Sequence, residues 1–267
     1  MRTAAVAFAV LYPLTLGAAC EHEPRASRDP SPQTADSQTA PVLLELFTSQ
    51  GCSSCPPADE LVRRAVHDAD APNVIALVYH VDYWNSLGWP DPFSNPRWTQ
   101  RQRDYADAIG SNRLYTPQVL LDGQDRGVGT SGHRMATAVA DAGHQANAMT
   151  LTLHTELDDD RVRVEVEPQW ANTQTADRAV VMVAVTDSGH RTRVPRGENA
   201  GRVLSGEFVV RDLARACAVP ASGTTRCRAS LSVQDIDDRS TMQVVAFAQD
   251  PQSWQVLGVA ASSPSSP

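Results

Sequence analysis

Lysine is absent from this sequence, and its positively charged residues form no cluster. All 23 basic residues are arginine, 31 residues are acidic, and the formal net charge is −8. Because attraction to phosphate needs clustered positive charge and no basic stripe occurs, this distribution argues against a nucleic-acid partner. Met-rich and His-rich segments, which would support copper handling by thiolates, are also missing.

Beyond the first twenty residues, the sequence lacks a hydrophobic run long enough to cross a membrane. The stretch 4–16 is largely apolar but short, Arg2 precedes it, and the small residues 17–19 follow it. This pattern is typical of a secretory signal. We therefore expect residues 1–20 to direct export to the periplasm or cell envelope.

Cys20 directly follows the small residues and resembles the lipidated cysteine of a bacterial lipoprotein signal, although Gly17 stands where that signal usually has a larger apolar residue. A lipid at Cys20 would be the sole membrane attachment. Ordinary cleavage, which leaves Cys20 removed or free, is the alternative. Residues 21–40 are polar and proline-containing and predict a disordered tether, and residues 262–267 predict a similar tail.

The periodicity of the remaining chain changes near residue 148. Residues 41–147 follow the order strand, helix, strand, helix, strand, hairpin partner, helix. This order predicts an α/β domain with a central mixed sheet flanked by helices. Residues 148–261 contain short alternating strand patterns instead, about seven of them, which predict a β-sandwich-like domain.

The chain has five cysteines, and an odd number in an exported protein needs an explanation. The simplest partition is a lipid anchor at Cys20, a vicinal pair at Cys52 and Cys55, and a structural disulfide between Cys217 and Cys227. Closing the loop of about ten residues would contribute about 2–3 kcal/mol in the chain-entropy model. A redox role for this last pair is disfavoured because no helix start adjoins it.

The Cys-x-x-Cys pair, Cys52 and Cys55, lies between a strand pattern at 42–47 and a helix pattern that opens with two prolines. Disulfide exchange needs a thiolate, and the N–H groups and dipole of a helix start stabilise that charge. Cys52 is therefore the expected nucleophile and Cys55 the resolving thiol. A static structural disulfide is the alternative. A zinc site would need about four ligands, so no metal or cofactor is expected.

The dipeptide Thr116-Pro117 directly precedes a strand pattern at 118–121. Together with the Cys-x-x-Cys motif it resembles the thioredoxin fold, in which a cis-proline loop faces the cysteines. The resemblance implies a cis peptide bond at Pro117 and places Thr116 beside the substrate groove, where its backbone would pair with a peptide. An ordinary strand-opening proline is the alternative, since most X–Pro bonds are trans.

Longer stretches are similar to a family of secreted, thioredoxin-like bacterial proteins called domain of unknown function 1223. The matching stretches are ELFTSQGCSSCPPAD at 45–59, HVDYW at 80–84, YTPQ at 115–118 and RGENAGR at 196–202. The resemblance covers about residues 41–260 and implies the fold and the site but no substrate. Unlike better-known thioredoxins, the chain has Ser-Ser between the cysteines, which leaves the direction of electron flow open.

Four further side chains are candidates for the site. Glu45, on the first strand pattern, would accept the proton of Cys55 if it lies buried behind the pair; a solvent-facing edge is the alternative. His80 and Asp82 follow the second strand pattern, where strand ends commonly face the site, and would bind substrate or assist proton transfer unless the loop is merely polar. Trp84 would line a peptide groove, with packing of its loop on its own domain as the favoured alternative.

These observations predict a cell-envelope thiol–disulfide oxidoreductase that acts on protein or small thiol substrates. Such a protein needs a thiol or disulfide protein client and a separate redox partner. The alternative from another class is a non-enzymatic envelope binding protein, in which a thioredoxin scaffold keeps Cys52–Cys55 as a static disulfide.

Overall fold

The apolar run before the cysteine motif forms β1 (Val42–Thr48), an inner strand of the main sheet of the computed structural model. The predicted signal and tether, from residue 2 to residue 38, and with them Cys20, lie outside the described residues. The unit Thr39–Pro267 is compact. The structure describes residues 1, 39–68, 73–126, 129, 131–171, 178–221 and 225–264.

Four strands of the first half lie side by side in the order β2-β1-β3-β4. β1 is parallel to β2 (Val74–His80) and antiparallel to β3 (Gln118–Leu121), which in turn pairs with β4 (Gln124–Asp125). All residues of β1 and β2 are buried. Continuous burial is expected for parallel strands that are covered on both faces.

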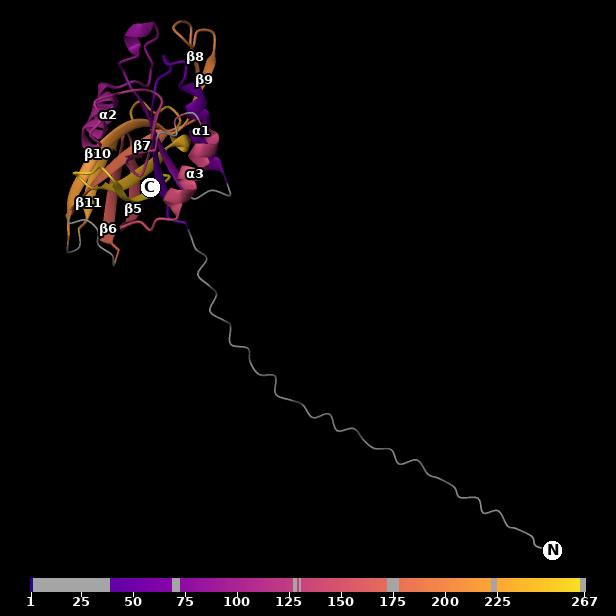
Figure 1. The fold of residues 1–267 in the computed structure, drawn as a ribbon. Helices are drawn as coiled ribbons and strands as arrows, with labels where there is room; N and C mark the ends of the chain where they lie inside the picture. Colours follow the sequence, from indigo (N-terminus) through magenta and orange to yellow (C-terminus); the bar gives the residue numbers. More distant parts are fainter. Residues whose placement is uncertain are drawn as a thin grey trace. The chain divides into compact units, whose positions relative to one another are not determined.

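Three helices cover these strands. α1 (Pro56–His67) and α3 (Gly132–Gly143) pack on one face, and α2 (Pro96–Ala108) packs on the other (Figure 1). The alternation of β1 explains the two cores, because successive side chains of a strand point to opposite faces. Leu44 packs with α1 and α3, whereas Phe47 packs with α2. The expected central mixed sheet with flanking helices is therefore present.

The sheet continues across the sequence boundary expected at residues 147 and 148. β2 is followed on its free edge by a strand of the second half, through the parallel pair Val209 and Val78. The complete order is β13-β12-β7-β10-β2-β1-β3-β4, a mixed eight-stranded sheet. The added strands are β7 (Arg178–Asp187), β10 (Val209–Pro220), β12 (Gln243–Gln249) and β13 (Val256–Ser262).

A second sheet packs on this extension. It has the order β11-β6-β5, with β5 (Met149–Asp158) and β6 (Arg161–Trp170) forming the hairpin expected from the sequence, and β11 (Cys227–Ser232) beside β6. Alternate residues of β6 are buried and share a core with β7 and β12. Cys217 on β10 and Cys227 on β11 form a disulfide with a Cα–Cα distance of 5.3 Å, the pairing expected from the cysteine partition, and this bond links the two sheets.

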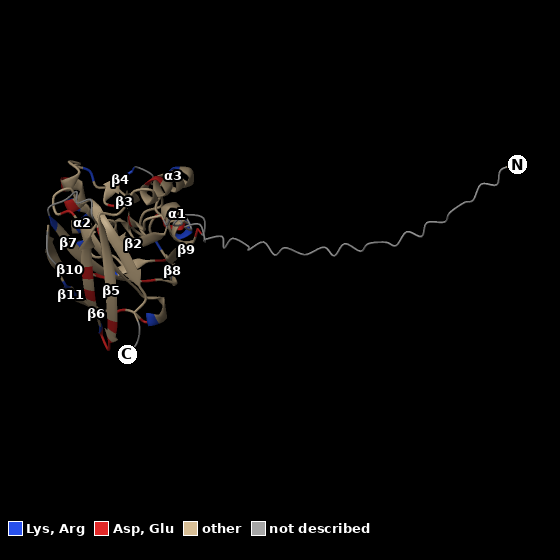
Figure 2. Cartoon of the chain, turned by 90° about the horizontal axis from the view of Figure 1, so that it is seen from below, with Lys and Arg blue, Asp and Glu red and all other residues tan. Residues whose placement is uncertain are grey.

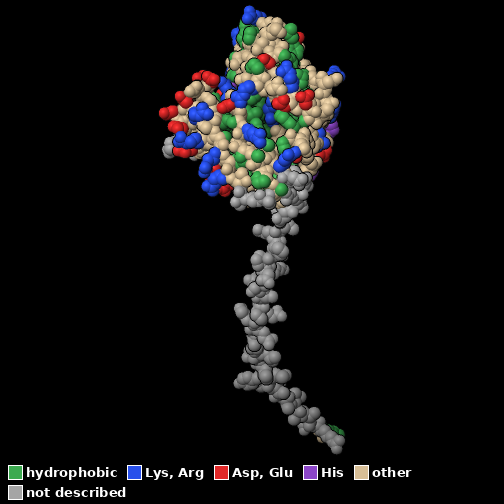
Figure 3. All heavy atoms as spheres, turned by 90° about the vertical axis from the view of Figure 1, so that its left-hand side faces the viewer, with side chains coloured by type: hydrophobic (Ala, Val, Ile, Leu, Met, Phe, Trp, Pro, Cys, Tyr) green, Lys and Arg blue, Asp and Glu red, His purple; other side chains and the backbone are tan. Residues whose placement is uncertain are grey.

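Charges of both signs are interspersed on the surface. Acidic side chains of β5 and β6, red in Figure 2, pair with Arg163, Arg226 and Arg228. The face drawn in Figure 3 likewise mixes arginine, acidic and hydrophobic side chains. Within the described ranges, none of the helices has the length and apolar character that a membrane crossing requires.

A small hairpin completes the fold. β8 (His190–Arg193) and β9 (Val203–Gly206) form a two-stranded sheet next to the helix α1 (Figure 1). The segment 194–202 between them reaches the loop that follows β1. A part of the β-rich half is thereby brought to the cysteine motif.

Candidate active site

Cys55 lies at the start of α1, and Cys52 lies in the loop just before it. Cys55 is the N-cap residue, and its carbonyl oxygen accepts the N–H of Asp59 at 3.1 Å. Pro56 and Pro57 fit the first turn because a helix start has no partners for their missing N–H groups. Cys52 and Cys55 form a disulfide with a Cα–Cα distance of 5.4 Å, and both are closed to solvent. A thiolate at this position would be stabilised by the helix start.

The loop before β3 lies against Cys52. The Thr116–Pro117 peptide bond is cis, as the resemblance implies, and the carbonyl oxygen of Thr116 lies 3.9 Å from Cys52 Sγ. The indole N–H of Trp84 donates a hydrogen bond to Thr116 Oγ1 at 2.8 Å. The structure thus gathers Cys52, Thr116, Pro117 and Trp84 at one place.

His80 and Asp82 follow the same strand but have different partners. His80 Nδ1 lies 2.7 Å from Asp91 Oδ2, and the same oxygen accepts the N–H of Gln50 at 2.7 Å. His80 is therefore connected through one carboxylate to the loop that carries Cys52. Asp82 accepts a hydrogen bond from the Thr99 hydroxyl at 2.5 Å, so its contact is with α2.

Glu45 is fully buried, so a solvent-facing edge, the alternative considered for it, is wrong. Its Oε1 accepts hydrogen bonds from Arg101 Nε at 2.9 Å and from the terminal guanidinium nitrogen at 2.7 Å, and Oε2 accepts from the Tyr105 hydroxyl. The α2 residues that bind it lie on the face of the sheet opposite to α1. Arg101 neutralises Glu45 on that side, and its hydrogen bonds with residues that the structure describes lead to α2 and not to Cys55.

Asp59 on α1 is a half-buried residue whose carboxylate has one oxygen closed to solvent. It follows Cys55 by four residues, which places both on one side of α1. Asp59 Oδ1 and Thr48 Oγ1 are inaccessible to solvent, and neither has a hydrogen bond of good geometry within the described residues, although the Thr48 hydroxyl is close enough to lower the pKa of Asp59. Burial raises the pKa of Asp59 to about 6, although the nearby His80 limits the rise.

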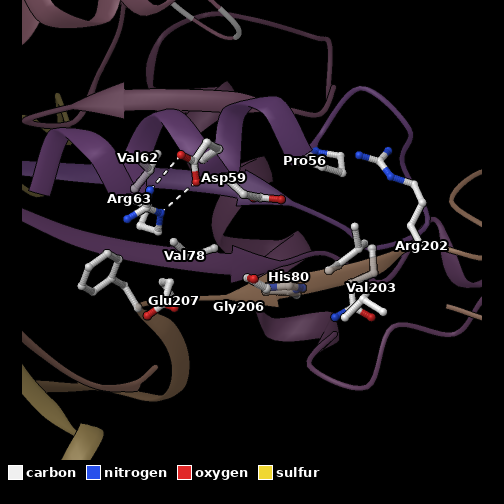
Figure 4. Close-up of a pocket in the computed structure, with 15 residues that line it drawn as sticks. Pro56, Asp59, Val62, Arg63, Val78, His80, Arg202, Val203, Gly206 and Glu207 are labelled. Atoms are coloured by element: carbon white, nitrogen blue, oxygen red, sulfur yellow. Dashed lines mark hydrogen bonds and ion pairs between the residues drawn. The ribbon is translucent and has the colours of Figure 1, made fainter. Parts of the chain in front are cut away.

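A pocket of about 190 Å³ opens beside Asp59, between α1, β2 and β9 (Figure 4). Asp59 lies on its α1 side and His80 on its β2 side. Burial acts to lower the pKa of His80, but the carboxylates of Asp91 and Asp59 outweigh burial and raise it. Burial acts to raise the pKa of Asp91, but His80 and the N–H groups of Gln50 and Phe93 hold it below its usual value. The pocket is thus lined by two titratable side chains, Asp59 on the helix that follows Cys55 and His80 across from it on β2.

The β-rich half supplies two further residues. The side-chain amide of Asn199 donates hydrogen bonds to the carbonyl oxygens of Gln50 at 2.9 Å and Cys52 at 3.0 Å. Glu198 Oε2 accepts the N–H of Ser53 at 2.9 Å. The sequence indicates the stretch 196–202 only through its resemblance to the family. It does not predict the contact with the cysteine loop, because no local pattern encodes a contact across about 150 positions.

The donor set for a metal is sparse. Within the ranges that the structure describes, no group of three or more His, Cys, Asp and Glu side chains is arranged to hold a metal ion.

The position of Asp59 could have been found from the sequence. A carboxylate four residues after a cysteine that caps a helix lies on the same side of that helix as the cysteine.

Comparison with known proteins identifies the family. The chain belongs to the family described as protein of unknown function DUF1223, whose model matches residues 43–249. A search of the curated proteins gave no match.

Solved structures share the fold. A crystal structure of a protein from Agrobacterium tumefaciens is 27% identical, with a TM-score of 0.57, over 82% of this chain and 92% of that one. HBP35 of Porphyromonas gingivalis is 15% identical, with a TM-score of 0.66, over 85% of this chain and 76% of that one. The second likeness concerns the fold alone.

Proposed function

We propose that this protein is a thiol–disulfide oxidoreductase of the cell envelope, acting through Cys52 and Cys55 on protein or small thiol substrates. One observation carries the proposal: Cys55 caps the start of α1, and Cys52, three residues earlier and disulfide-bonded to it, lies against the Thr116–Pro117 loop. A helix start favours the thiolate that exchange requires. The neighbouring loop offers a backbone carbonyl to which an extended client peptide can donate.

The fold that we propose is a thioredoxin-like unit followed by a β-sandwich-like unit. The strand order β2-β1-β3-β4, with one parallel and two antiparallel pairs and helices on both faces, supports the first unit. The packing of the sheet β11-β6-β5 on β7 and β12 supports the second.

The location that we propose is outside the cytoplasm. The pattern of residues 2–20 supports export, and a lipid on Cys20 would be the membrane attachment. The disulfide between Cys217 and Cys227 agrees with an oxidising compartment, since such bonds are rare where thiols are kept reduced.

In the reductive direction, the Cys52 thiolate attacks one sulfur of a client disulfide and expels the other sulfur as a thiolate. Cys55 then loses its proton and attacks Cys52 Sγ, which releases the second client thiol and leaves the Cys52–Cys55 disulfide. Two electrons have passed to the client, and a dithiol redox partner restores the pair by the same exchange. The steps in reverse oxidise a client dithiol.

Asp59 is the proton acceptor that we assign to Cys55, in place of Glu45. Helical side chains lean toward the N-terminus, so Asp59 is directed toward the cysteine one turn before it. Its pKa of about 6 leaves it largely ionised at neutral pH and basic enough to take a thiol proton. Glu45 is unsuited because Arg101 neutralises it on the other face of the sheet.

The assignment is tested by Asp59→Asn, with the neighbouring exposed Glu60→Gln as the matched control. We expect Asp59→Asn to slow the resolution of a Cys52 mixed disulfide about 100-fold near pH 7, and to remove an inflection near pH 6 from the pH profile. Stopped-flow release of a fluorescent client thiol measures this step. Equal rates and profiles for both variants would remove Asp59 from the mechanism.

A static disulfide is the second candidate function, because both sulfurs are closed to solvent. Equilibration of the protein with glutathione buffers, followed by alkylation and mass spectrometry, separates the two. An oxidoreductase opens Cys52–Cys55 reversibly, keeps Cys217–Cys227 closed as an internal control, and has a Cys52 thiol pKa below the value of about 8.5 for a free cysteine. A pair that resists mild reductant and has an unshifted thiol is a static bridge.

The same titration gives the direction of electron flow. A reduction potential near about −270 mV indicates a reductant, and one near about −120 mV indicates an oxidant.

A further inference from the structure

The segment Arg196–Arg202, called here the 196–202 segment, is fixed to the cysteine loop by one buried amide. Asn199 is 1% exposed and donates to two backbone carbonyls, at Gln50 and at Cys52. Arg202 donates to Asn199 Oδ1 at 2.8 Å, which fixes the orientation of the amide. A buried amide with three hydrogen bonds holds its partners in a defined position.

Close backbone packing places the 196–202 segment against a second loop. Gly197 has a φ of +82°, and a Cβ at Gly88 would lie 3.3 Å from Gly197 Cα. Trp89, the next residue, donates its indole N–H to Gln50 Oε1 at 3.1 Å. The cysteine loop is therefore held between two segments from different parts of the chain.

Glu198 brings a negative charge to the start of α1. Its carboxylate accepts the N–H of Ser53, the residue directly after Cys52, at 2.9 Å. Pro56 and Pro57 carry no N–H, so few backbone donors remain at this helix start. A thiolate on Cys52 would have to share these donors with a carboxylate of the same sign.

We propose that the 196–202 segment completes the dithiol site: Asn199 positions the Cys52 loop, and Glu198 makes the Cys52 thiolate less favourable and so favours the disulfide form. The inference rests on the proposed oxidoreductase function and deepens it. Glu198 is a tuning residue and Asn199 a positioning residue, because neither exchanges a sulfur. A stabilised thiolate makes a dithiol pair a stronger oxidant, and Glu198 acts in the opposite direction.

Other titratable groups surround the Cys52 loop and stay unchanged in the test. They are Cys55 and Asp59 on α1, His80 at the end of β2, Asp91 on the loop after β2, and Arg202 on the 196–202 segment itself. A substitution at position 198 therefore removes the charge of Glu198 and leaves the other charged groups around the Cys52 loop in place.

The first test is Glu198→Gln, which keeps an acceptor for the Ser53 N–H and removes only the charge. The matched control is Glu156→Gln on β5, where the exposed glutamate pairs with Arg163. We expect the Cys52 thiol pKa to fall, and the ratio of reduced to oxidised protein in a fixed glutathione buffer to rise about three- to tenfold. The ratio for Glu156→Gln should equal that of the native protein.

The second test asks whether Asn199 acts by holding Glu198 in place. Asn199→Ala should shift the Cys52 thiol pKa in the same direction as Glu198→Gln, and adding Glu198→Gln to it should bring little further change. Circular dichroism confirms that each variant is folded. Additive shifts in the double variant would overturn the positioning role.

The outcomes separate this inference from the function on which it rests. If native Cys52–Cys55 exchanges with glutathione but Glu198→Gln leaves both the thiol pKa and the redox ratio unchanged, or moves them the other way, the tuning role is wrong and the oxidoreductase stands. If the native pair does not exchange at all, the proposed function fails and this inference fails with it.

Discussion

Two carboxylates lie near β1, on opposite faces of the sheet. Glu45 faces α2, where Arg101 pairs with it and Tyr105 donates a hydrogen bond. Asp59 projects from α1 on the other face, where the charge of His80 and the Thr48 hydroxyl lower its pKa but do not outweigh burial. Glu45 has a fixed cationic partner and Asp59 does not, and for this reason we assign the proton-accepting role to Asp59.

Removing the cation of the Glu45 pair should give the largest effect. Arg101→Met leaves the buried Glu45 carboxylate without its cation and with only the Tyr105 hydroxyl as a donor, and we expect a loss of about 3–5 kcal/mol in the free energy of unfolding. Urea unfolding at pH 7 measures it. Adding Glu45→Gln to Arg101→Met should recover much of the lost free energy of unfolding, because the uncompensated charge of Glu45 is then removed.

If Arg101→Met is as stable as the native protein, Glu45 does not need Arg101 to compensate its charge, and the difference that we infer between Glu45 and Asp59 is wrong. The exposed Arg163→Met, whose ion pairs are open to solvent, is the control and should unfold at the native urea concentration.

Asp59 should give the next largest effect, and it should depend on pH. Its folded pKa of about 6 lies above that of an unfolded aspartate, so the folded state binds the extra proton and loses stability as the pH rises from about 4 to about 6. Asp59→Asn should therefore be more stable than the native protein above pH 6, by at most about 3 kcal/mol, and similar to it below about pH 4.

Urea unfolding of both proteins at steps of pH checks this expectation. The comparison at each pH cancels groups on which Asp59 does not act, and the remaining difference belongs to Asp59 together with His80, whose pKa Asp59 raises. A stability difference that stays constant with pH would mean that Asp59 does not titrate in this range.

Tyr105→Phe should have a smaller effect than Arg101→Met. The Tyr105 hydroxyl donates to Glu45 and accepts hydrogen bonds from Gln249 at 2.9 Å and Arg101 at 3.1 Å. The ion pair remains in the variant, so we expect a loss of about 1.5–2 kcal/mol from unsatisfied polar groups. Thermal and urea unfolding measure it, and a loss as large as that of Arg101→Met would assign the hydroxyl a greater role than the guanidinium.

Glu60→Gln should have the smallest effect on stability. Glu60 is next to Asp59 on α1 but exposed, and hydrogen bonds from Arg63 and Arg64 lower its pKa to about 2. Solvent screens such pairs, so unfolding at pH 7 should match that of the native protein. A clear loss would show that exposure does not separate these two adjacent carboxylates.

Local features of the site follow from local sequence. The prolines after Cys55 predict the helix start, and the structure has it at Pro56. The resemblance implied the cis bond at Pro117, which is present. Periodicity predicted the strands around β1 because burial on both faces leaves a continuous apolar run. Each of these features involves neighbours in the chain.

Features that depend on distant partners were missed. The alternation in β1 shows that Glu45 lies between apolar neighbours, but nothing in it shows that Arg101, 56 positions away, neutralises it. The pairing of β10 with β2 joins the halves of the chain through Val209 and Val78, where each segment alone reads only as a strand.

By itself, the sequence determined which segments form strands and helices and that two thiols stand at the opening of one helix, because backbone propensity and hydrophobic alternation act over a few residues. Only the tertiary structure decided which carboxylate is neutralised and which is not, and that Asn199 binds the carbonyl of Cys52 from 147 positions away. The physical reason is that charge compensation and hydrogen bonding depend on distance in space, and a strand pattern does not encode its partners.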